Sequence, residues 1–303
     1  MAELTCFQEK ISSALPQNIL KFNEPMAKHT SFRIGGPVEV MAFPENAAQL
    51  SELLKVSKQL DIVPAILGAG TNVLAPDEGM KGLVICLKDC LDGMELLGGD
   101  RIRVMAGVTM TRAAVYAANQ GLSGMEFAHG IPGTVGGGVY MNAGAYGGEI
   151  GQICESVSVM DMDGEIRELS RGEMGFSYRH SLLEEQPGIV LSAVFALEQG
   201  DPLQIKEKMK ELMGKRSASQ PLDLPSAGSA FKRPVGGFAA ALIDQAGLKG
   251  FQIGGAAVSE KHAGFVVNKG GATARDVQNL LKEVSERVLA AFGIHLEPEV
   301  RIW

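Results

Sequence analysis

The sequence has no excess of positive charge, no long apolar run and no secretion signal. Its 303 residues carry a net charge of −7 at pH 7, which argues against a broad nucleic-acid-binding surface. No run reaches the roughly 18 apolar residues that a membrane helix needs. Residues 1–20 lack the basic start and apolar core of a signal peptide. These absences predict a cytoplasmic protein that binds neither nucleic acid nor a membrane.

Sequence motifs for binding a metal or a nucleoside triphosphate are also absent. The four cysteines, Cys6, Cys86, Cys90 and Cys154, contain no CxxC pair and no metal-ligand spacing. We therefore expect reduced, structural thiols and no metal site. The pattern GxxxxGK[ST] does not occur, which argues against a P-loop kinase or ATPase. The hydrophobic content of 46% is enough for a buried core in two or three domains.

Glycine, in contrast, is abundant, with eight glycines among residues 130–148. Each glycine costs conformational entropy on folding, so we expect no ordinary helix or strand in this stretch. Its bare backbone N–H groups would form a concave anion site, the usual place of a phosphate or pyrophosphate. A flexible linker is disfavoured because Ile131, Val135 and Val139 favour burial.

A second glycine loop, at 68–74, follows an apolar segment. It does not match a dinucleotide fingerprint, because Val73 stands where GxGxxG needs its third glycine. A phosphate-binding loop and a plain turn both remain open for this segment alone. Two such loops about 60 residues apart suggest one large cofactor that contains a pyrophosphate.

Apolar periodicity predicts the remaining elements. Helices are expected at 3–15, 47–59, 111–119, 201–215, 238–246 and 273–292, the last with a capping signal at Thr273 and Asp276. Strands are expected at 62–67, 82–87, 101–106, 189–197, 251–258, 264–268 and 296–303, with a hairpin at 157–169 that turns at Asp163 and Gly164. A shift in composition places a boundary near residue 200.

Six motifs then occur in one order along the chain. They are TSFRIGG at 30–36, LGAGTNVL at 67–74, GIPGTVGG at 130–137 with MNAGAY at 141–146, YRHS at 178–181, AGSAFK at 227–232 and EVRI at 299–302. The ordered set resembles the UDP-N-acetylenolpyruvoylglucosamine reductases, also called UDP-N-acetylmuramate dehydrogenases. The resemblance covers the chain from about residue 25 to its end. Within that family the chain is similar to the shorter subtype.

The resemblance implies an α+β fold of the vanillyl-alcohol oxidase (PCMH) type. An extension at 1–24 would precede a two-part FAD-binding domain at 25–200, with subdomains at about 25–90 and 91–200. An α+β substrate-binding domain at 201–303 would follow, its last strand carrying a catalytic glutamate. FAD would be bound without a covalent link. The residues that would hold it are Gly68, Ala69, Gly70, Thr71, Asn72, Gly130, Pro132, Gly133, Thr134, Gly136, Gly137, Asn142, Ala143 and Gly144.

The resemblance also implies a reaction in peptidoglycan precursor synthesis. NADPH would reduce the flavin and leave, and the flavin would deliver hydride to the enolpyruvyl methylene carbon of UDP-N-acetylglucosamine enolpyruvate, forming UDP-N-acetylmuramate. Arg179 suits the substrate carboxylate, since a guanidinium can grip it with two hydrogen bonds. Glu299, in its protonated form, would be the second partner, and Ser229 matches the proton donor. We expect a monomer whose only partners are these small molecules.

Further residues are candidates for the site, with alternatives. The residues expected to bind substrate are Tyr178, Lys215, Lys232 and Arg233, and the three cations among them, together with Arg216, would lie near its diphosphate. A solvated helix face is the better interpretation for Lys206, Lys208 and Lys210. Glu297 competes with Glu299, because both lie on one face of the expected strand. Asn142, Tyr146 and His262 suit the site or simple burial equally well.

Two departures from the family pattern stand out. Gly138 occupies a position where alanine is expected, and the chain lacks the inserted segment of longer members, so a tyrosine from that insertion has no counterpart here.

Three competing functions remain. A related flavin oxidase would often attach FAD through a histidine near the first glycine loop, and none stands at 68–74. A non-catalytic nucleotide-binding module is disfavoured by Arg179, Ser229 and Glu299. A Rossmann dehydrogenase would bind NAD and have no yellow colour.

Overall fold

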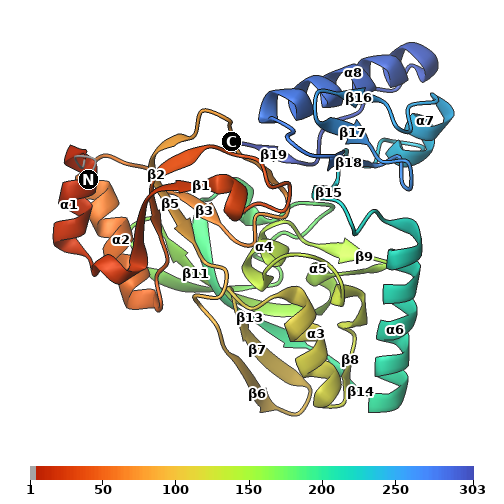
Figure 1. Ribbon diagram of the computed structural model, residues 1–303. Helices are drawn as coiled ribbons and strands as arrows, with labels where there is room; N and C mark the ends of the chain where they lie inside the picture. The colour runs from red at the N-terminus through yellow and green to blue at the C-terminus, as the bar shows by residue number, and fades with distance from the viewer. Residues whose placement is uncertain (1–4) are drawn as a thin grey trace. The chain divides into compact units, whose positions relative to one another are not determined.

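The chain forms two compact units in a computed structural model that describes residues 5–303 (Figure 1). Unit 1 consists of Met1–Phe22, Glu39–Ala69 and Gly82–Lys215, and unit 2 of Asn23–Val38, Gly70–Lys81 and Arg216–Trp303. Two stretches from the first hundred residues therefore belong with the C-terminal part of the chain. The division expected from the sequence, with breaks after residues 24 and 200, stays a prediction about separately folding domains.

Helices and strands are mixed along the chain, which confirms the predicted α+β class. The helices are α1 (Cys6–Ala14), η1 (Gln17–Ile19), η2 (Met26–Lys28), α2 (Ala47–Gln59), α3 (Met110–Asn119), η3 (Glu126–Ala128), α4 (Val135–Tyr140), α5 (Ile150–Ile153), η4 (Leu182–Glu184), α6 (Pro202–Ser219), α7 (Ala239–Gln245) and α8 (Ala274–Phe292). The strands are β1 (Leu20–Pro25), β2 (Pro37–Ala42), β3 (Ala65–Leu67), β4 (Val73–Leu74), β5 (Met80–Cys86), β6 (Met94–Gly98), β7 (Arg101–Met105), β8 (Leu122–Ser123), β9 (Gly144–Ala145), β10 (Gly148–Glu149), β11 (Cys154–Asp161), β12 (Ile166–Ser170), β13 (Gly188–Ala196), β14 (Glu198–Gln199), β15 (Ser226–Ser229), β16 (Gln252–Ile253), β17 (Ala256–Val258), β18 (Phe265–Asn268) and β19 (Arg301–Ile302).

The central sheet of unit 1 has five antiparallel strands in the order β12-β11-β13-β7-β6. Its middle strand β13 is buried over most of its length, and α4 packs against it. The predicted hairpin is confirmed, because β11 and β12 pair and Gly164 takes a positive φ of 88° at the turn. This sheet gives the glycine-rich stretch a buried surface to pack on.

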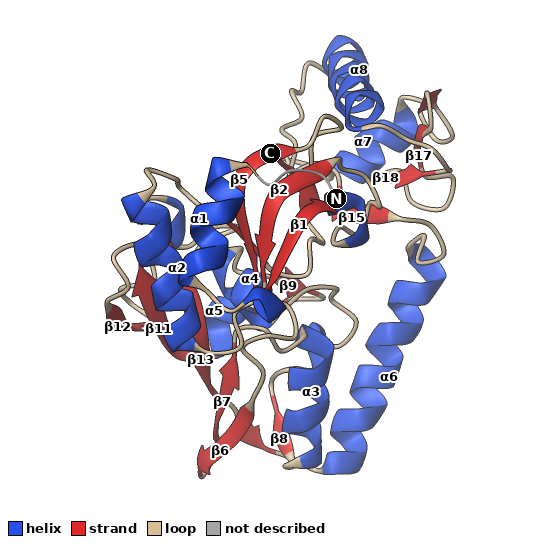
Figure 2. Ribbon diagram, turned by 60° about the vertical axis from the view of Figure 1, so that its left-hand side comes forward, coloured by secondary structure: helices blue, strands red, loops and turns tan. Residues whose placement is uncertain are grey.

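Helices α1 and α2 lie side by side (Figure 2). Helix α2 begins after Asn46, whose side chain accepts a hydrogen bond from the N–H of Gln49 at 3.0 Å. Its apolar face, which includes Leu50 and Leu53, is buried, and its bounds are the predicted ones. The helix expected at 3–15 is α1; its part before residue 5 and the thiol of Cys6 lie outside the described residues.

Unit 2 contains a four-stranded sheet in the order β15-β18-β17-β16, with α8 packed against β16 and β17. The predicted capping signal of α8 is confirmed as a reciprocal pair of hydrogen bonds between Thr273 and Asp276. Asp77 adds a second cap, since its carboxylate accepts from the N–H groups of Ala274 at 2.7 Å and Arg275 at 3.1 Å. Those two bonds fix the 70–81 segment on the start of α8.

The glycine-rich stretch contains a helix, so the expectation of no helix there is wrong. Helix α4 (Val135–Tyr140) includes three consecutive glycines. It forms because its surroundings compensate for its low intrinsic propensity. The Thr134 hydroxyl accepts from the N–H of Gly137 at 3.3 Å, and the N–H of Gly136 donates to the carbonyl of Ala106 at 2.9 Å.

The last predicted strand is shorter than expected. Of 296–303, only β19 (Arg301–Ile302) pairs regularly, in parallel with β4. Pro298 has no N–H to donate to a ladder, and it makes an isolated bridge to Phe231 instead. Two other predicted strands are also longer than the observed ones. Of 62–67, only β3 forms a strand, and 251–258 forms two short strands, β16 and β17. No described helix is both long enough and apolar enough to span a membrane.

Candidate active site

The two glycine loops touch each other in unit 1. A Cβ atom placed on Gly68 would lie 2.6 Å from the hydroxyl oxygen of Thr134, far inside van der Waals contact. Only glycine therefore permits this approach. The sequence separates these residues widely, and the structure brings them together as expected for the halves of one binding site.

The N–H groups of the two loops divide into two classes. Those of 135–138 all donate within the protein, so they are not available to a phosphate. By contrast, the N–H groups of Gly68, Ala69, Gly133 and Thr134 donate to no other residue within 5–303. These four donors come from two loops in contact, and such a set fits an anionic pyrophosphate.

This result refines the expected cofactor contacts. Gly136 and Gly137 can meet a ligand through their bare Cα atoms but not through N–H donation. The N–H groups of Gly130 and Ala143 are also taken, by the Thr111 hydroxyl at 3.2 Å and the Gly138 carbonyl at 2.7 Å. The N–H groups of the loop at 68–70 are thus less engaged within the protein than those of the longer glycine-rich stretch.

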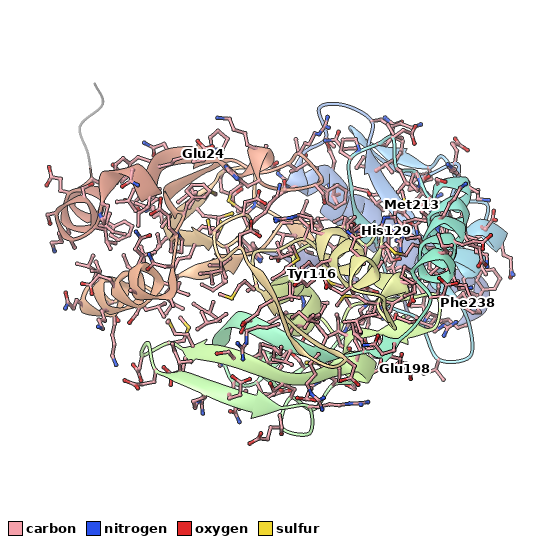
Figure 3. The ribbon with its side chains drawn as sticks, turned by 90° about the horizontal axis from the view of Figure 1, so that it is seen from below. Glu24, Tyr116, His129, Glu198, Met213 and Phe238 are labelled. Carbon is pink, nitrogen blue, oxygen red and sulfur yellow. The ribbon has the colours of Figure 1, made fainter. Side chains whose placement is uncertain are left out.

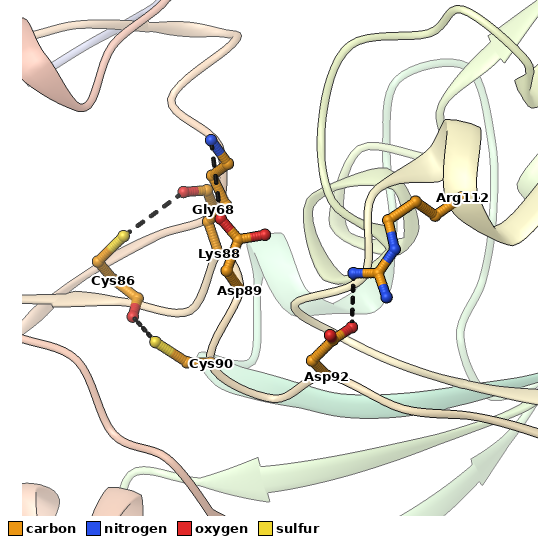
Figure 4. Close-up of polar contacts among 7 residues, drawn as sticks. All are labelled: Gly68, Cys86, Lys88, Asp89, Cys90, Asp92 and Arg112. Carbon is orange, nitrogen blue, oxygen red and sulfur yellow. Dashed lines mark hydrogen bonds and ion pairs between the residues drawn. The ribbon is translucent and has the colours of Figure 1, made fainter.

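Two thiols lie beside the first loop (Figure 4). The Cys86 thiol donates to the carbonyl of Gly68 at 3.9 Å, and the Cys90 thiol donates to the carbonyl of Cys86 at 3.3 Å. Burial raises the pKa of Cys86 and raises that of Cys90 to about 12. Both thiols therefore stay protonated near neutral pH and support the loop without acting as nucleophiles. Cys154 is likewise free, and burial raises its pKa to about 12.

Ser229 and Glu299 occupy neighbouring segments of unit 2. Ser229 ends β15, pairs with Phe265 and is exposed. The N–H of Glu299 donates to the carbonyl of Ala230 at 2.9 Å. The Asn72 side chain donates to the carbonyl of Glu299 at 3.1 Å, so the first glycine loop also reaches this segment. Three predicted site residues are thereby brought close together.

Glu297 differs from Glu299 in its surroundings. The Nζ atom of Lys232 lies 3.2 Å from a carboxylate oxygen of Glu297, and the N–H of Lys232 donates to the Glu297 carbonyl at 2.9 Å. Glu297 is exposed, whereas Glu299 is half-buried. The lysine expected to meet a substrate diphosphate therefore already has an acidic partner, and the more enclosed glutamate is Glu299.

Arg179 sits in a tight turn of unit 1. The backbones of Ser177 and His180 exchange two hydrogen bonds of 3.2 Å, leaving Tyr178 and Arg179 at the tip. Arg179 has a φ of 56°, a left-handed conformation that disfavours side chains with a Cβ. Its guanidinium carbon lies 5.2 Å from the centre of the Tyr178 ring. Strain at a predicted catalytic residue is a reason to seek function there.

The other predicted cations also have protein contacts. Lys215 lies 2.6 Å from Glu211, and hydrogen bonds from Lys215 and Lys208 lower the pKa of Glu211 to about 2. Arg216 is 5% exposed and donates to the Gln220 side chain at 3.3 Å. The guanidinium carbon of Arg233 lies 3.9 Å from the ring centre of Phe238, which is 60% exposed and labelled in Figure 3.

Asn142, Tyr146 and His262, which the sequence assigns equally to the site or to simple burial, differ in their exposure. Asn142 is fully buried, and Tyr146 is 44% exposed. His262 is half-buried; burial lowers its pKa, and its Nδ1 atom accepts from the N–H of Gly264 at 3.1 Å. Its ring lies 5.0 Å from that of Phe265, the residue paired with Ser229. His262 therefore lies next to the strands that carry the site.

Ser31 is a residue that no sequence pattern singled out by itself. Its N–H donates to the carbonyl of Gly70 at 3.0 Å, and its hydroxyl donates to the carbonyl of Ser226 at 2.6 Å. It therefore connects the first glycine loop to the strand that ends at Ser229. The only sequence signal for it was its place in the motif at 30–36. Arg179 belongs to unit 1, whereas Ser229 and Glu299 belong to unit 2.

Comparisons with known proteins identify the family. An FAD-binding domain family matches residues 38–170, and the C-terminal domain of UDP-N-acetylenolpyruvoylglucosamine reductase matches residues 220–303. The UDP-N-acetylenolpyruvoylglucosamine reductase of Caldanaerobacter subterraneus subsp. tengcongensis is 46% identical over 302 residues, covering 100% of this chain and 99% of that protein. The enzyme of the same name from Latilactobacillus sakei subsp. sakei is 47% identical over 93% of each chain.

A solved structure supports the same assignment. The crystal structure of UDP-N-acetylenolpyruvylglucosamine reductase from Thermus caldophilus superimposes with a TM-score of 0.80 at 35% identity, covering 94% of this chain and 98% of that one. With similarity of this extent in both sequence and fold, the chain belongs to the UDP-N-acetylenolpyruvoylglucosamine reductase family of FAD-dependent oxidoreductases in peptidoglycan precursor synthesis.

Proposed function

We propose that this protein reduces UDP-N-acetylglucosamine enolpyruvate to UDP-N-acetylmuramate with NADPH as the electron donor. FAD, held without a covalent link by residues of the two glycine loops and reduced by NADPH, would supply the hydride for the methylene carbon of the enolpyruvyl group. The π electrons of the carbon–carbon double bond shift toward the substrate carboxylate, and the adjacent carbon then takes one proton. Hydride and proton together account for the two hydrogens that the product gains.

Three side chains carry the chemistry in this proposal. Arg179 grips the substrate carboxylate and stabilises the negative charge that develops there. Glu299, protonated, donates a hydrogen bond to the same developing charge. Ser229 gives its hydroxyl proton to the adjacent carbon; a serine is a weak acid, so this step depends on a strongly basic, well-placed acceptor.

The observation that carries the proposal is the similarity to reductases of known name over the whole length of the chain. Several contacts support it. The unengaged N–H groups of Gly68, Ala69, Gly133 and Thr134 suit the pyrophosphate of FAD. Gly70, Thr71, Asn72, Pro132 and Gly144 complete the proposed cofactor surface.

Substrate binding is assigned to four polar side chains. Tyr178 would contact the substrate beside Arg179. Lys215, Lys232 and Arg233 would exchange part of their present contacts for charge-assisted hydrogen bonds to the diphosphate. We propose that the protein acts as a monomer in the cytoplasm.

An anaerobic titration of the flavin tests this function. NADPH should bleach the absorbance of the oxidised flavin, and UDP-N-acetylglucosamine enolpyruvate should restore it. In the Ser229→Ala variant, bleaching by NADPH should keep its rate while restoration slows by at least a hundredfold, because only the second step needs the serine proton. Bleaching without restoration in the unaltered protein would discard the substrate. Flavin that stays with the denatured chain would indicate a covalent oxidase instead.

A further inference from the structure

The turn that carries Arg179 is joined to the glycine-rich stretch by two side-chain hydrogen bonds, one from Asn142 and one from Ser181. A left-handed φ at a residue other than glycine is unfavourable and persists only where the surroundings over-determine it. The two hydrogen bonds between Ser177 and His180 close the turn but do not fix its position. The residues on either side of the turn must therefore be anchored.

The first anchor is Asn142. Its Nδ2 atom donates to the carbonyl of Ser177 at 2.8 Å, just before the turn. Its Oδ1 atom accepts from the N–H of Gly151 at 2.8 Å. The side chain is fully buried, and Asn142 itself has a φ of 43°. Both ends of the amide are therefore committed to the protein.

The second anchor is Ser181, just after the turn. Its hydroxyl donates to the carbonyl of Tyr140 at 2.8 Å, and its side chain is fully buried. Tyr140 and Asn142 lie two residues apart at the end of α4. One short segment therefore holds the chain on both sides of Tyr178 and Arg179.

We propose that Asn142 and Ser181 are positioning residues for Arg179 and act together as a clamp on its turn. The inference rests on the proposed function, because it concerns the group that would grip the substrate carboxylate. It also replaces the direct cofactor contact expected for the Asn142 side chain. The amide is fully buried, and its nitrogen and its oxygen each make a hydrogen bond of 2.8 Å within the protein.

The clamp has a mechanistic reason. A guanidinium forms two parallel bonds with a carboxylate only in a narrow range of positions. A displacement of about 1 Å in such a contact can cost about a hundredfold in rate. Since α4 packs against the buried strand β13, the clamp connects the arginine turn to the central sheet of unit 1.

A double-mutant cycle tests this coupling. Reoxidation of the reduced flavin by UDP-N-acetylglucosamine enolpyruvate is measured for Ser181→Ala, Arg179→Ala and the double variant. Ser181→Ala alone should slow reoxidation by at least tenfold, with FAD affinity and reduction by NADPH unchanged. In the Arg179→Ala background the same change should have no further effect, because the clamp acts only through the arginine. Asn142→Ala should behave in the same way if it folds.

Ser57→Ala is the matched control. Ser57 is 1% exposed, lies in unit 1 and donates to the carbonyl of Leu53 at 2.7 Å, within its own helix. It should leave both half-reactions unchanged. Equal losses from Ser181→Ala with and without Arg179 would overturn the proposal, since a merely structural serine would give that result. Weaker FAD binding in Ser181→Ala would also overturn it.

Hydrogen exchange separates this inference from the proposed function. Amides at 175–182 should exchange faster in Ser181→Ala than in the unaltered protein, and those in Ser57→Ala should not. Unchanged exchange would exclude the clamp whatever the substrate. A protein whose flavin is not reoxidised by the substrate, yet whose amides respond as expected, would disprove the proposed function and the catalytic purpose of the clamp but leave its geometry intact.

Discussion

The backbone N–H of Glu299 donates to the carbonyl of Ala230 at 2.9 Å. Ala230 follows Ser229 directly, so this bond places the glutamate segment beside the serine segment. Asn72 strengthens the arrangement from the other side by donating to the Glu299 carbonyl at 3.1 Å. Ser229 and Glu299 are 70 positions apart in the sequence, and their proximity gives the choice between Glu297 and Glu299 a structural basis.

Substitution of the two glutamates should separate their roles. Glu299→Gln should slow reoxidation of the flavin by substrate at least a hundredfold, because its protonated carboxyl would support the developing charge. Glu297→Gln should change the rate less than about threefold, since an exposed pair such as that with Lys232 contributes little. Stopped-flow absorbance measures both. A loss from Glu297→Gln as large as that from Glu299→Gln would transfer the catalytic role to Glu297.

Replacement of Arg179 by glycine should separate stability from activity. Glycine accepts the φ of 56° without strain. We therefore expect Arg179→Gly to be more stable than Arg179→Ala by about 1 kcal/mol, measured by urea denaturation. Both variants should lose turnover with substrate and keep reduction by NADPH, because neither has a guanidinium.

The comparison with alanine is the control for loss of the side chain. An Arg179→Gly protein less stable than Arg179→Ala would mean that the turn is not strained. Arg179→Lys provides a second test, since it keeps the charge but loses the planar fork. Turnover close to that of the unaltered protein in Arg179→Lys would exclude the two-bond grip on the carboxylate.

The neighbouring His180 should make stability depend on pH. Its Nε2 atom lies 2.6 Å from Glu185, and this hydrogen bond, with the charges of Glu185 and Glu184, raises the pKa of His180 above 6.5. A histidine with a raised pKa in the folded state contributes stability below its unfolded value, and loses it as pH rises through the folded value. Thermal unfolding of the unaltered protein and Glu185→Gln should therefore differ most near about pH 6 and coincide by about pH 9. A difference that grew with pH would contradict this assignment.

Much of the fold could be predicted because its signals are local. Helix α2 has a cap at Asn46 and an apolar face at helical spacing, so its bounds can be read from the sequence alone. The same holds for α8 with Thr273 and Asp276. Helix α4 could not be predicted, because its stability comes from Ala106 and β13, which contact it only in the folded chain. Pro298, likewise, limits the last strand through a partner at Phe231 that the local sequence does not reveal.

The candidate site divides in the same way. Motif order was enough to select Arg179, Ser229 and Glu299 for testing. The supporting contacts were not visible, because each joins segments far apart in the sequence. Ser31 reaches Ser226, and Asn142 reaches Ser177, through single hydrogen bonds that leave no periodic pattern. For Asn142, a conspicuous place in a glycine-rich motif suggested a ligand contact where the structure has an internal bond.

Gly138, where the family pattern suggests alanine, has a partner that accounts for the departure. A Cβ atom at Gly138 would lie 2.8 Å from the sulfur of Met110, which is fully buried. Alanine should improve helix propensity by up to about 1 kcal/mol, but it must displace this sulfur. We therefore expect Gly138→Ala alone to destabilise the protein or leave it unchanged.

Met110→Val removes the sulfur and terminal methyl and should be destabilising by itself through the cavity it leaves. In the double variant, the methyl group that Gly138→Ala introduces would fill part of that cavity. The losses in the free energy of unfolding should then not be additive. The double variant should lose about 1 kcal/mol less than the sum of the losses in the two single variants. Denaturation of the four proteins measures this coupling. Strict additivity would mean that Met110 does not explain the glycine, because neighbours competing for one space must couple.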